Sequence, residues 1–320
     1  MTHVGEENNV KGSQKVKEII LKTNDLTKKY SGGAGAKQIN MTLRKGDIYG
    51  FIGQNGAGKT TLLRLITGLI HPTNGNLELF GSSEEQALIL ARKRIGAMIE
   101  TPAFFPKMTA RGNLEYYRIQ RGIKNQNEIE RVLKLVNLDA TGSKPFNQFS
   151  LGMKQRLGLA LAIMGEPELL ILDEPINGLD PTGMIEFREI IRQLNQEKNL
   201  TILISSHILS ELTQIATRYG VIHHGVLIKE FSKEELDKNT QGYISMKVSS
   251  AVKAGEIIQS TINAAQVEVP STEEVRLFNF YQDTSQVIEL LSANDIKIYS
   301  SNEVKINLED YFIHLIGEIA

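Results

Sequence analysis

Residues 47–61 read DIYGFIGQNGAGKTT, and this stretch decides the fold class. Asp47–Ile52 is typical of a strand, and the TTLLRLITGL stretch of residues 60–69 is typical of a helix. Between them, Gly53–Thr60 matches the pattern G-x-x-x-x-G-K-[ST], which requires a strand before it and a helix after it. Glycines let the backbone N–H groups of such a loop turn toward phosphate oxygens. The stretch therefore predicts an α/β domain that binds a nucleotide.

The polar side chains of this loop have expected tasks. Lys59 is predicted to reach the β- and γ-phosphates as a catalytic residue, and the Thr60 hydroxyl is predicted to ligate Mg²⁺. The alternative is a chance glycine turn before a helix, but the flanking strand and helix are both predicted here. The residues predicted to surround the phosphates are Gly53, Asn55, Gly56, Gly58, Lys59, Thr60 and Thr61.

The composition limits what else the chain does. Its 320 residues suffice for one large domain and a small one, and its net charge of −1 comes without the long basic stretch of a general nucleic-acid binder. The absence of cysteine excludes disulfides and thiol catalysis, and six histidines make zinc an unfavoured cofactor. No apolar run approaches the roughly 18 residues that a membrane span needs. Because the start, MTHVGEENNVKGSQKVK, also lacks an apolar signal-peptide core, we expect a cytoplasmic protein that only a partner holds at a membrane.

Strands alternate with helices over most of the chain. The apolar stretches Leu169–Leu172 and Thr201–Ser205 are typical of parallel strands buried on both faces. Residues 18–236 are therefore predicted to form one α/β domain with a helical insertion at about 84–167, after a disordered polar tail at 1–17. Further predicted elements are strands at Ile19–Leu21 and Gln38–Leu43 and helices at 84–95, 110–121, 126–137 and 182–198.

Two carboxylates follow the apolar strand at 169–172. Ligands of parallel sheets bind at the carboxyl ends of the strands, where Asp173 and Glu174 stand. Asp173 is the expected Mg²⁺ carboxylate of an enzyme with such a phosphate loop. Glu174 is predicted to polarise the water that attacks the γ-phosphate. The alternative for Glu174 is a solvated charge at a strand end.

His207 ends the next predicted strand, 33 residues after Glu174. The ends of parallel strands emerge at one edge of the sheet, so His207 is predicted to reach the γ-phosphate. A histidine at a strand end is otherwise more often structural.

A second anion site is predicted in residues 149–165, FSLGMKQRLGLALAIMG. Ser150 is a good N-cap for the helix that follows, and Gly152 leaves the backbone of the first turn open. A bare helix N-terminus beside a hydroxyl favours an anion.

These motifs together resemble the nucleotide-binding subunit of ATP-binding cassette (ABC) transporters, over residues 18 to about 235. Residues 149–155, FSLGMKQ, fall where that family has its signature LSGGQ, with Leu151 in place of a glycine and Met153 in place of the glutamine. Residues 177–180 resemble the family's D-loop, and Tyr30 falls where an aromatic ring stacks on adenine. The alternative for Tyr30 is a half-buried aromatic at a strand end.

The resemblance implies an ATP-dependent, head-to-tail homodimer. In this family each ATP lies between the phosphate loop of one cassette and the signature helix of the other. Ser150, Gly152 and Asp180 would then bind the partner's nucleotide. The implied cofactors are ATP and Mg²⁺, and the implied reaction is ATP hydrolysis.

One position departs from the family pattern. The family usually places a glutamine in the segment that here reads IGAMIETPAFFP, residues 95–106, and Glu100 takes that place. A glutamate still suits Mg²⁺, so Glu100 is a third predicted metal ligand beside Thr60 and Asp173. The alternative is that Glu100 lies on the surface outside the site. Phe104 and Phe105 are either an exposed dock for a membrane subunit or ordinary core residues.

The segment IETPAFFP, the altered signature and LEDYF at Leu308–Phe312 resemble a narrower group, the ATPase subunits of bacitracin and lantibiotic self-protection exporters. That resemblance implies an exporter ATPase on the cytoplasmic face of the membrane with separate integral-membrane subunits. The alternatives are a soluble ABC ATPase that acts on a macromolecular complex and a nucleotide-gated regulator without enzymatic activity. The presence of Lys59, Asp173, Glu174 and His207 argues against the regulator.

Residues 237–320 are predicted to form a small accessory domain. Their pattern reads β-α-β-β-α-β, the order of a ferredoxin-like α+β fold, followed by a last helix. No cluster of catalytic residue types occurs in it. Its predicted elements are strands at Tyr243–Val248, Val267–Val269, Val275–Phe280 and Ile296–Ser300 and helices at Val252–Asn263, Gln282–Ala293 and Leu308–Ile316.

Overall fold

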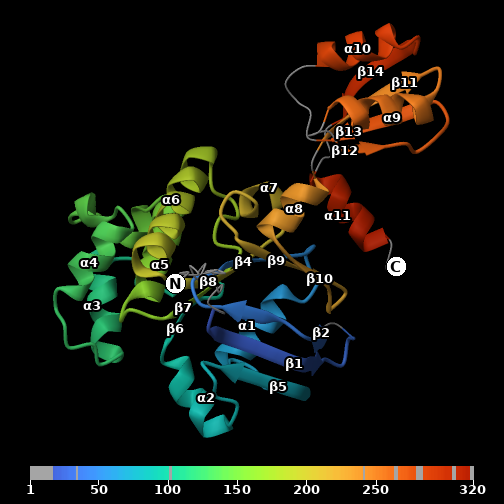
Figure 1. Cartoon of the computed structure of the whole chain (residues 1–320). Helices are drawn as coiled ribbons and strands as arrows, with labels where there is room; N and C mark the ends of the chain where they lie inside the picture. Colours follow the sequence, from blue (N-terminus) through green and yellow to red (C-terminus); the bar gives the residue numbers. More distant parts are fainter. Residues whose placement is uncertain are drawn as a thin grey trace, which may run out of the picture. The chain divides into compact units, whose positions relative to one another are not determined.

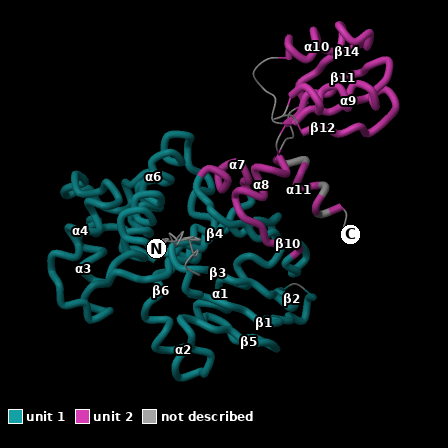
Figure 2. The backbone as a smooth tube through the Cα atoms, in the orientation of Figure 1, with its two compact units in different colours: residues 1–207, 215–227 teal, residues 208–214, 228–320 magenta. Residues whose placement is uncertain are grey.

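The computed structural model describes residues 17–33, 35–100, 103–240, 242–262, 266–278, 284–304 and 308–317. Its contacts divide the chain into two compact units (Figure 2), residues 1–207 with 215–227 and residues 208–214 with 228–320. The predicted boundary at 236 therefore differs from the observed division. Composition changes near 236, but the packing of the chain already changes at 228. Of the predicted tail, all but Lys17 lies outside the described residues.

A parallel sheet forms the centre of the first unit. Its strands run in the order β9-β4-β8-β7-β6, and their residues are buried on both faces at the centre, as the apolar patterns predicted. The carboxyl ends of β4, β7 and β8 lie at one edge, because Asp173 is in register with Ser205 and Ile52 with Ser206. The strands are β4 (Ile48–Ile52), β6 (Ile95–Met98), β7 (Leu169–Asp173), β8 (Thr201–Ser206) and β9 (Arg218–His223).

An antiparallel sheet packs on the same core. Its strand β1 (Ile19–Lys29) pairs with β2 (Gly35–Ile39), β3 (Thr42–Arg44) and β5 (Asn74–Leu79). The predicted strand at Ile19–Leu21 continues for eight more residues, and the predicted strand at Gln38–Leu43 is two strands. The sequence pattern did not predict these bounds, because the second half of β1 is polar and has no apolar alternation. Hydrogen bonding to several other strands stabilises it instead.

Helix α1 (Lys59–Thr67) follows the glycine loop and fills the space beside both sheets. Its apolar residues belong to the core cluster of the first unit. Full burial of each leucine or isoleucine side chain stabilises the fold by about 1.5–3 kcal/mol. These residues are Leu62, Leu63, Leu65 and Ile66.

The remaining helices of the first unit mostly lie in the predicted insertion. Helices α3, α4 and α5 gather on the side of this unit away from β1, β2 and β5 (Figure 1). Residues 84–167 are not wholly helical, however, because Ile95–Met98 is the edge strand β6 of the parallel sheet. The helices are α2 (Glu85–Arg92), α3 (Ala110–Gln120), α4 (Glu128–Leu135), α5 (Leu151–Ile163) and α6 (Pro181–Lys198), with short 3₁₀ turns at Asp139–Thr141 and Phe146–Gln148.

The second unit contains the predicted ferredoxin-like fold. Its strands are antiparallel in the order β12-β13-β11-β14, and α9 and α10 contribute to the core on one face of this sheet. Residue 263 and residues 279–283, at the ends of predicted elements, lie outside the described residues. The bounds are α7 (Leu209–Leu212), α8 (Lys233–Asn239), β11 (Tyr243–Val248), α9 (Ala251–Thr261), β12 (Gln266–Glu268), β13 (Glu274–Phe278), α10 (Thr284–Ala293), β14 (Ile298–Val304) and α11 (Leu308–Gly317). Strand β10 (Val226–Ser232) begins in the first unit and continues in the second.

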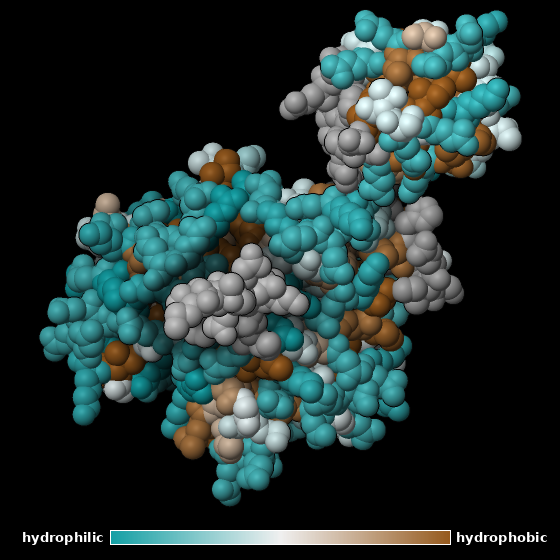
Figure 3. Space-filling view, viewed as in Figure 1, coloured by the Kyte–Doolittle hydropathy of each residue, from teal (hydrophilic) through white to brown (hydrophobic). Residues whose placement is uncertain are grey.

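Hydrophilic residues cover most of the face drawn in Figure 3. In the described ranges, none of the helices combines the length and apolar character that crossing a membrane requires.

Candidate functional site

The glycine loop places α1 with its N-terminus open. Gly58 is the N-cap of α1 with φ of 108°, a conformation that L side chains rarely adopt. A Cβ atom built on Gly58 would lie 2.6 Å from the Gly35 carbonyl oxygen, and one built on Gly53 would lie 2.6 Å from the Ile222 oxygen. The first amides of α1 have no acceptor inside the helix, so they are available to an anion. A cavity of about 250 Å³ lies here, lined by Gly35, Asn55, Gly56, Gly58, Lys59, Thr60, Thr61 and Glu174.

Asp173 joins this loop to the parallel sheet. The Thr60 hydroxyl donates to Asp173 Oδ2 at 2.7 Å, and the Ser205 hydroxyl donates to Asp173 Oδ1 at 2.6 Å. Because strand β7 ends at Asp173, the carboxylate reaches the first turn of α1. The structure thus brings together two of the three predicted metal ligands.

Glu174 turns to different partners. Its φ of 48° lies in the left-handed region, and its N–H donates to Ser205 Oγ at 3.0 Å and to the Ser205 carbonyl at 3.2 Å. Its Oε2 lies 2.7 Å from His207 Nδ1, and its Oε1 lies 3.1 Å from Lys59 Nζ as an ion pair without hydrogen-bond alignment. The carboxylates of the adjacent residues Asp173 and Glu174 therefore have different partners. The first contacts Thr60, and the second lies between Lys59 and His207.

Lys59 is nearly buried, with 5% of its surface exposed. Its ammonium donates to the Gly53 carbonyl at 2.5 Å and the Gln54 carbonyl at 3.2 Å. These carbonyls and Glu174 balance the buried charge. The three predicted catalytic residues, Lys59, Glu174 and His207, meet at one edge of the sheet, as the parallel-strand argument predicted.

A second cavity, of about 360 Å³, lies where two helices begin. Ser150 caps α5 by accepting from the Met153 N–H at 3.3 Å, and Asp180 caps α6 by accepting from the Gly183 N–H at 2.9 Å. A Cβ atom built on Gly152 would meet only Leu179 Cδ2, at 3.8 Å, so packing within the chain does not require a glycine there. The lining residues are Ser150, Leu151, Gly152, Arg156, Gly178, Leu179, Asp180, Thr182, Gly183 and Glu186. Lys59, Asp173, Glu174 and His207 are not among them.

Two predicted residues, Tyr30 and Glu100, line neither of these cavities. Tyr30 follows the end of β1 with 41% of its surface exposed, and the Lys28 ammonium lies 5.7 Å from the centre of its ring. The Glu100 side chain is 65% exposed and forms an ion pair with Arg64 of α1. The structure does not bring Glu100 to Thr60 or Asp173, because Arg64 holds its carboxylate. Its role as a metal ligand stays a prediction.

Sequence reasoning missed two supports of the site. The first is Ser205, which forms hydrogen bonds with both Asp173 and Glu174. The sequence indicated it only through the two serines before His207, which predict a polar end of the strand. The turn after β9 supports the glycine loop, because the Gly225 N–H donates to the Ala57 carbonyl at 2.8 Å.

At the end of β9, beside this turn, burial lowers the pKa of His223 below its ordinary value, and the nearby ring of His224 lowers this pKa further.

Phe104 and Phe105 were predicted to be either an exposed dock or ordinary core residues, and one description fits each residue. Phe104 is buried, with its ring 5.9 Å from the ring of Tyr117 and edge-on to it. Phe105 is 42% exposed and packs against Tyr116, at 4.8 Å between ring centres. The exposed apolar residues here are Phe105, Met108, Tyr116 and Ile119, which we call the α3 patch.

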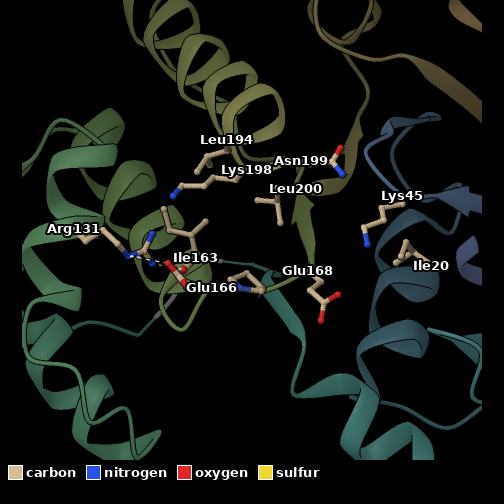
Figure 4. Close-up of a pocket in the computed structure, with 11 residues that line it drawn as sticks. Ile20, Lys45, Arg131, Ile163, Glu166, Glu168, Leu194, Lys198, Asn199 and Leu200 are labelled. Carbon is tan, nitrogen blue, oxygen red and sulfur yellow. Dashed lines mark hydrogen bonds and ion pairs between the residues drawn. The ribbon is translucent and has the colours of Figure 1, made fainter. Parts of the chain in front are cut away.

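A further cavity of about 290 Å³ lies at the opposite edge of the sheet (Figure 4). It is lined by Lys45, Glu168 and Leu200, which precede β4, β7 and β8, so it opens at the amino ends of these strands. Glu168 makes two hydrogen bonds to Arg94, and Arg131 pairs with Glu166 and Glu128. This cavity is separate from the phosphate loop and contains none of the predicted site residues.

The fold and the site define an ATP-binding cassette, and the comparisons with known proteins agree. The family model described as ABC transporter matches residues 36–177. The bacitracin transport ATP-binding protein BcrA of Bacillus licheniformis is 41% identical over 298 residues, which cover 93% of this chain and 97% of that protein. The chain therefore belongs to the ABC transporter family, as an ATP-hydrolysing subunit.

Two further proteins, one compared by sequence and one by structure, resemble only part of this chain. The lantibiotic transport ATP-binding protein SrtF of Streptococcus pyogenes is 41% identical over 211 residues, covering 66% of this chain and 90% of that protein. The structure of cbiO1 from Clostridium perfringens, part of the ABC transporter complex cbiONQ, matches with a TM-score of 0.62 and 27% identity over 69% of this chain and 92% of that chain. The likeness to BcrA thus extends over nearly the whole chain, and the others cover about two thirds of it.

Proposed function

We propose that this chain is the ATPase subunit of an exporter that removes a peptide antibiotic, with separate integral-membrane subunits. The observation that carries the proposal is the meeting of Lys59, Glu174 and His207 beside the Thr60–Asp173 pair at one sheet edge. The likeness to BcrA, named for bacitracin transport, and to SrtF, named for lantibiotic transport, supports the class of cargo.

The residues at the phosphate loop fit Mg²⁺. Thr60 and Asp173 present oxygen ligands in direct contact with each other, and Mg²⁺ in nucleotide sites is usually held by one or two carboxylates together with phosphates. Bound Mg²⁺ would neutralise charge on the phosphates, and Glu100 would become a third ligand only by leaving Arg64.

We assign the hydrolytic step to the residues around Glu174. The open amides of α1 and the Lys59 ammonium bind the phosphate oxygens and stabilise the charge of the transition state. Glu174 Oε2 accepts a proton from the attacking water, whose oxygen bonds to the γ-phosphorus as the bond to ADP breaks. His207, 2.7 Å from this carboxylate, orients it and contacts the γ-phosphate. The Lys59–Glu174 ion pair separates when ATP takes the place of the carboxylate at the ammonium.

We assign the second cavity to the nucleotide of a second copy of the chain. The N-termini of α5 and α6 both line it, and helix N-termini favour negative charge. None of the catalytic side chains of the same chain lines this cavity. A head-to-tail homodimer would supply the missing phosphate loop, and ATP would hold the two copies together.

The α3 patch is the proposed contact with a membrane subunit. Phe105, Tyr116 and Ile119 expose apolar surface on one helix and the segment before it. Exposed apolar groups of this kind mark interaction surfaces. Such a contact would hold the chain at the cytoplasmic face of the membrane.

The test is to express the chain together with any multi-span membrane protein that is encoded beside its gene. We expect the two proteins to copurify, and we expect cells to gain resistance to bacitracin or to a lantibiotic. The Glu174→Gln variant should copurify and give no resistance. Loss of copurification in the double variant Phe105→Ser, Tyr116→Ser, but not in Val252→Ser of α9, whose side chain is also exposed, would support the patch. An active ATPase that copurifies with no membrane protein would contradict the transport role.

A further inference from the structure

We infer that Ser205 is a positioning residue, which sets both the metal-binding carboxylate and the water-activating carboxylate through one hydroxyl group. This inference rests on the roles proposed for Asp173 and Glu174. Ser205 is fully buried at the end of β8. Its hydroxyl donates to Asp173 Oδ1 at 2.6 Å and accepts from the Glu174 N–H at 3.0 Å.

The register of the sheet places Ser205 for this task. Residues in register on parallel strands point to the same face, and Asp173 is in register with Ser205. Two residues earlier on each strand, Ile171 and Leu203 belong to the core cluster that contains α1. Asp173 and Ser205 therefore continue this face toward Thr60, while the neighbouring Ser206 points to the other face.

The two hydrogen bonds of the Ser205 hydroxyl restrain different motions, one of a side chain and one of the backbone. The bond to Asp173 Oδ1 fixes the rotation of the carboxylate, so that Oδ2 stays directed at Thr60. The bond from the Glu174 N–H supports a left-handed backbone conformation that a glutamate rarely adopts. Without the hydroxyl, Asp173 Oδ1 loses its donor, and the Glu174 amide keeps only the Ser205 carbonyl at 3.2 Å.

The experiment compares Ser205→Ala with Ser205→Thr and with Thr201→Val in the full-length protein. Thr201 is equally buried at the other end of β8, where its hydroxyl accepts from the Gly46 N–H at 3.0 Å, so Thr201→Val also removes one buried hydroxyl. The first readout is the affinity of Mn²⁺ for the ATP-bound protein, measured by electron paramagnetic resonance. Further readouts are ATP affinity without metal, kcat and KM, and the unfolding temperature.

For Ser205→Ala we expect weaker Mn²⁺ binding and a lower kcat, each by about 10- to 100-fold, as for other residues that orient a metal ligand. ATP affinity without metal and KM should stay near the wild-type values. Ser205→Thr should restore most of the Mn²⁺ affinity, and Thr201→Val should lower the unfolding temperature alone. If Ser205→Ala does not fold, Ser205→Cys keeps the volume with a weak donor and should show an intermediate loss of Mn²⁺ affinity.

Asp173→Ala separates this inference from the proposed function. If Asp173→Ala weakens Mn²⁺ binding while Ser205→Ala and Ser205→Cys leave it unchanged, the role of Ser205 is overturned and the metal assignment stands. If Asp173→Ala leaves Mn²⁺ binding unchanged, the metal assignment and the role of Ser205 both fail. Equal losses in Ser205→Ala and Thr201→Val would also overturn the inference, because loss of any buried hydroxyl would then suffice.

Discussion

The N-termini of α1 and α5 are the two places where we propose that phosphate binds, yet they differ in what surrounds them. At α1 the buried Lys59 of the helix itself meets two carboxylates and a histidine from the ends of β7 and β8, beside the open amides. At α5 the cap Ser150 is exposed, and its cavity is completed by a second helix N-terminus at Asp180. One chain therefore gathers Lys59, Asp173, Glu174 and His207 at the first site and none of these residues at the second.

Under the proposed function, this difference accounts for the presence of two such sites in one protein. A helix N-terminus attracts phosphate, but it contributes neither a base nor a metal ligand. With the α5 site assigned to the nucleotide of a second copy, we expect it to act only when the phosphate loop of that copy is brought to it.

The largest expected effect lies at the α1 site. Glu174→Gln keeps the shape of the side chain and removes the base, so hydrolysis should fall by about 10²- to 10⁴-fold while ATP still binds. A nucleotide-bound dimer should then accumulate. Phosphate release and size-exclusion chromatography with ATP measure the two effects. Near-normal turnover would remove Glu174 from the mechanism.

Mixing two inactive variants tests the proposed sharing directly. Lys59→Ala damages the α1 site and Ser150→Arg blocks the α5 site, so each homodimer should be inactive. A mixed dimer pairs one intact phosphate loop with one intact α5 site, and activity should return up to about one working site per dimer if the sites are independent. Phosphate release from the mixture is compared with each variant alone. No recovery, with mixed dimers demonstrated by cross-linking, would contradict independent shared sites.

A smaller change separates helix capping from nucleotide binding at α5. Ser150→Ala and Thr109→Ala each remove an N-cap hydroxyl, since Thr109 caps α3 by accepting from the Gly112 N–H at 3.1 Å. Both should cost about 1 kcal/mol in the free energy of unfolding. Only Ser150→Ala should weaken ATP-induced dimerisation, by about 10- to 100-fold for one hydrogen bond to a charged group. Denaturant unfolding and analytical ultracentrifugation measure the two quantities. Equal dimerisation in both variants would reduce Ser150 to a helix cap.

The smallest expected effect concerns Glu100, which pairs with Arg64 one turn after Thr60 on α1. Glu100→Gln removes an exposed ion pair that contributes about 0–1 kcal/mol to stability, so the protein should fold and hydrolyse ATP. If Glu100 also ligates the metal, the ratio of Mg²⁺- to Mn²⁺-supported rates should change. Glu168→Gln, which breaks the exposed pair with Arg94, should leave this ratio unchanged. An inactive Glu100→Gln would mean that Glu100 has a role we have not described.

Elements with strong local patterns were predicted closely. The apolar runs at β7 and β8 and the strand β11 were found within one or two residues of their predicted bounds. The sequence pattern did not identify β5, and it placed β6 within a helical insertion. Asn74–Leu79 alternates weakly, and it forms a strand because β1 supplies its partner. Such pairing depends on residues about fifty positions away.

By itself, the sequence determined the α/β class, the phosphate loop and the residue types of the site, because spacing along the chain decides where glycines, the lysine and the carboxylates stand. The tertiary structure decided their partners. Parallel register puts Ser205 between Asp173 and Glu174, and the left-handed turn at Glu174 directs its carboxylate to Lys59 and His207. The same packing holds Glu100 at Arg64 and joins the N-termini of α5 and α6 around one cavity. These contacts join residues far apart in the chain, whose distances follow from how strands and helices pack rather than from local sequence.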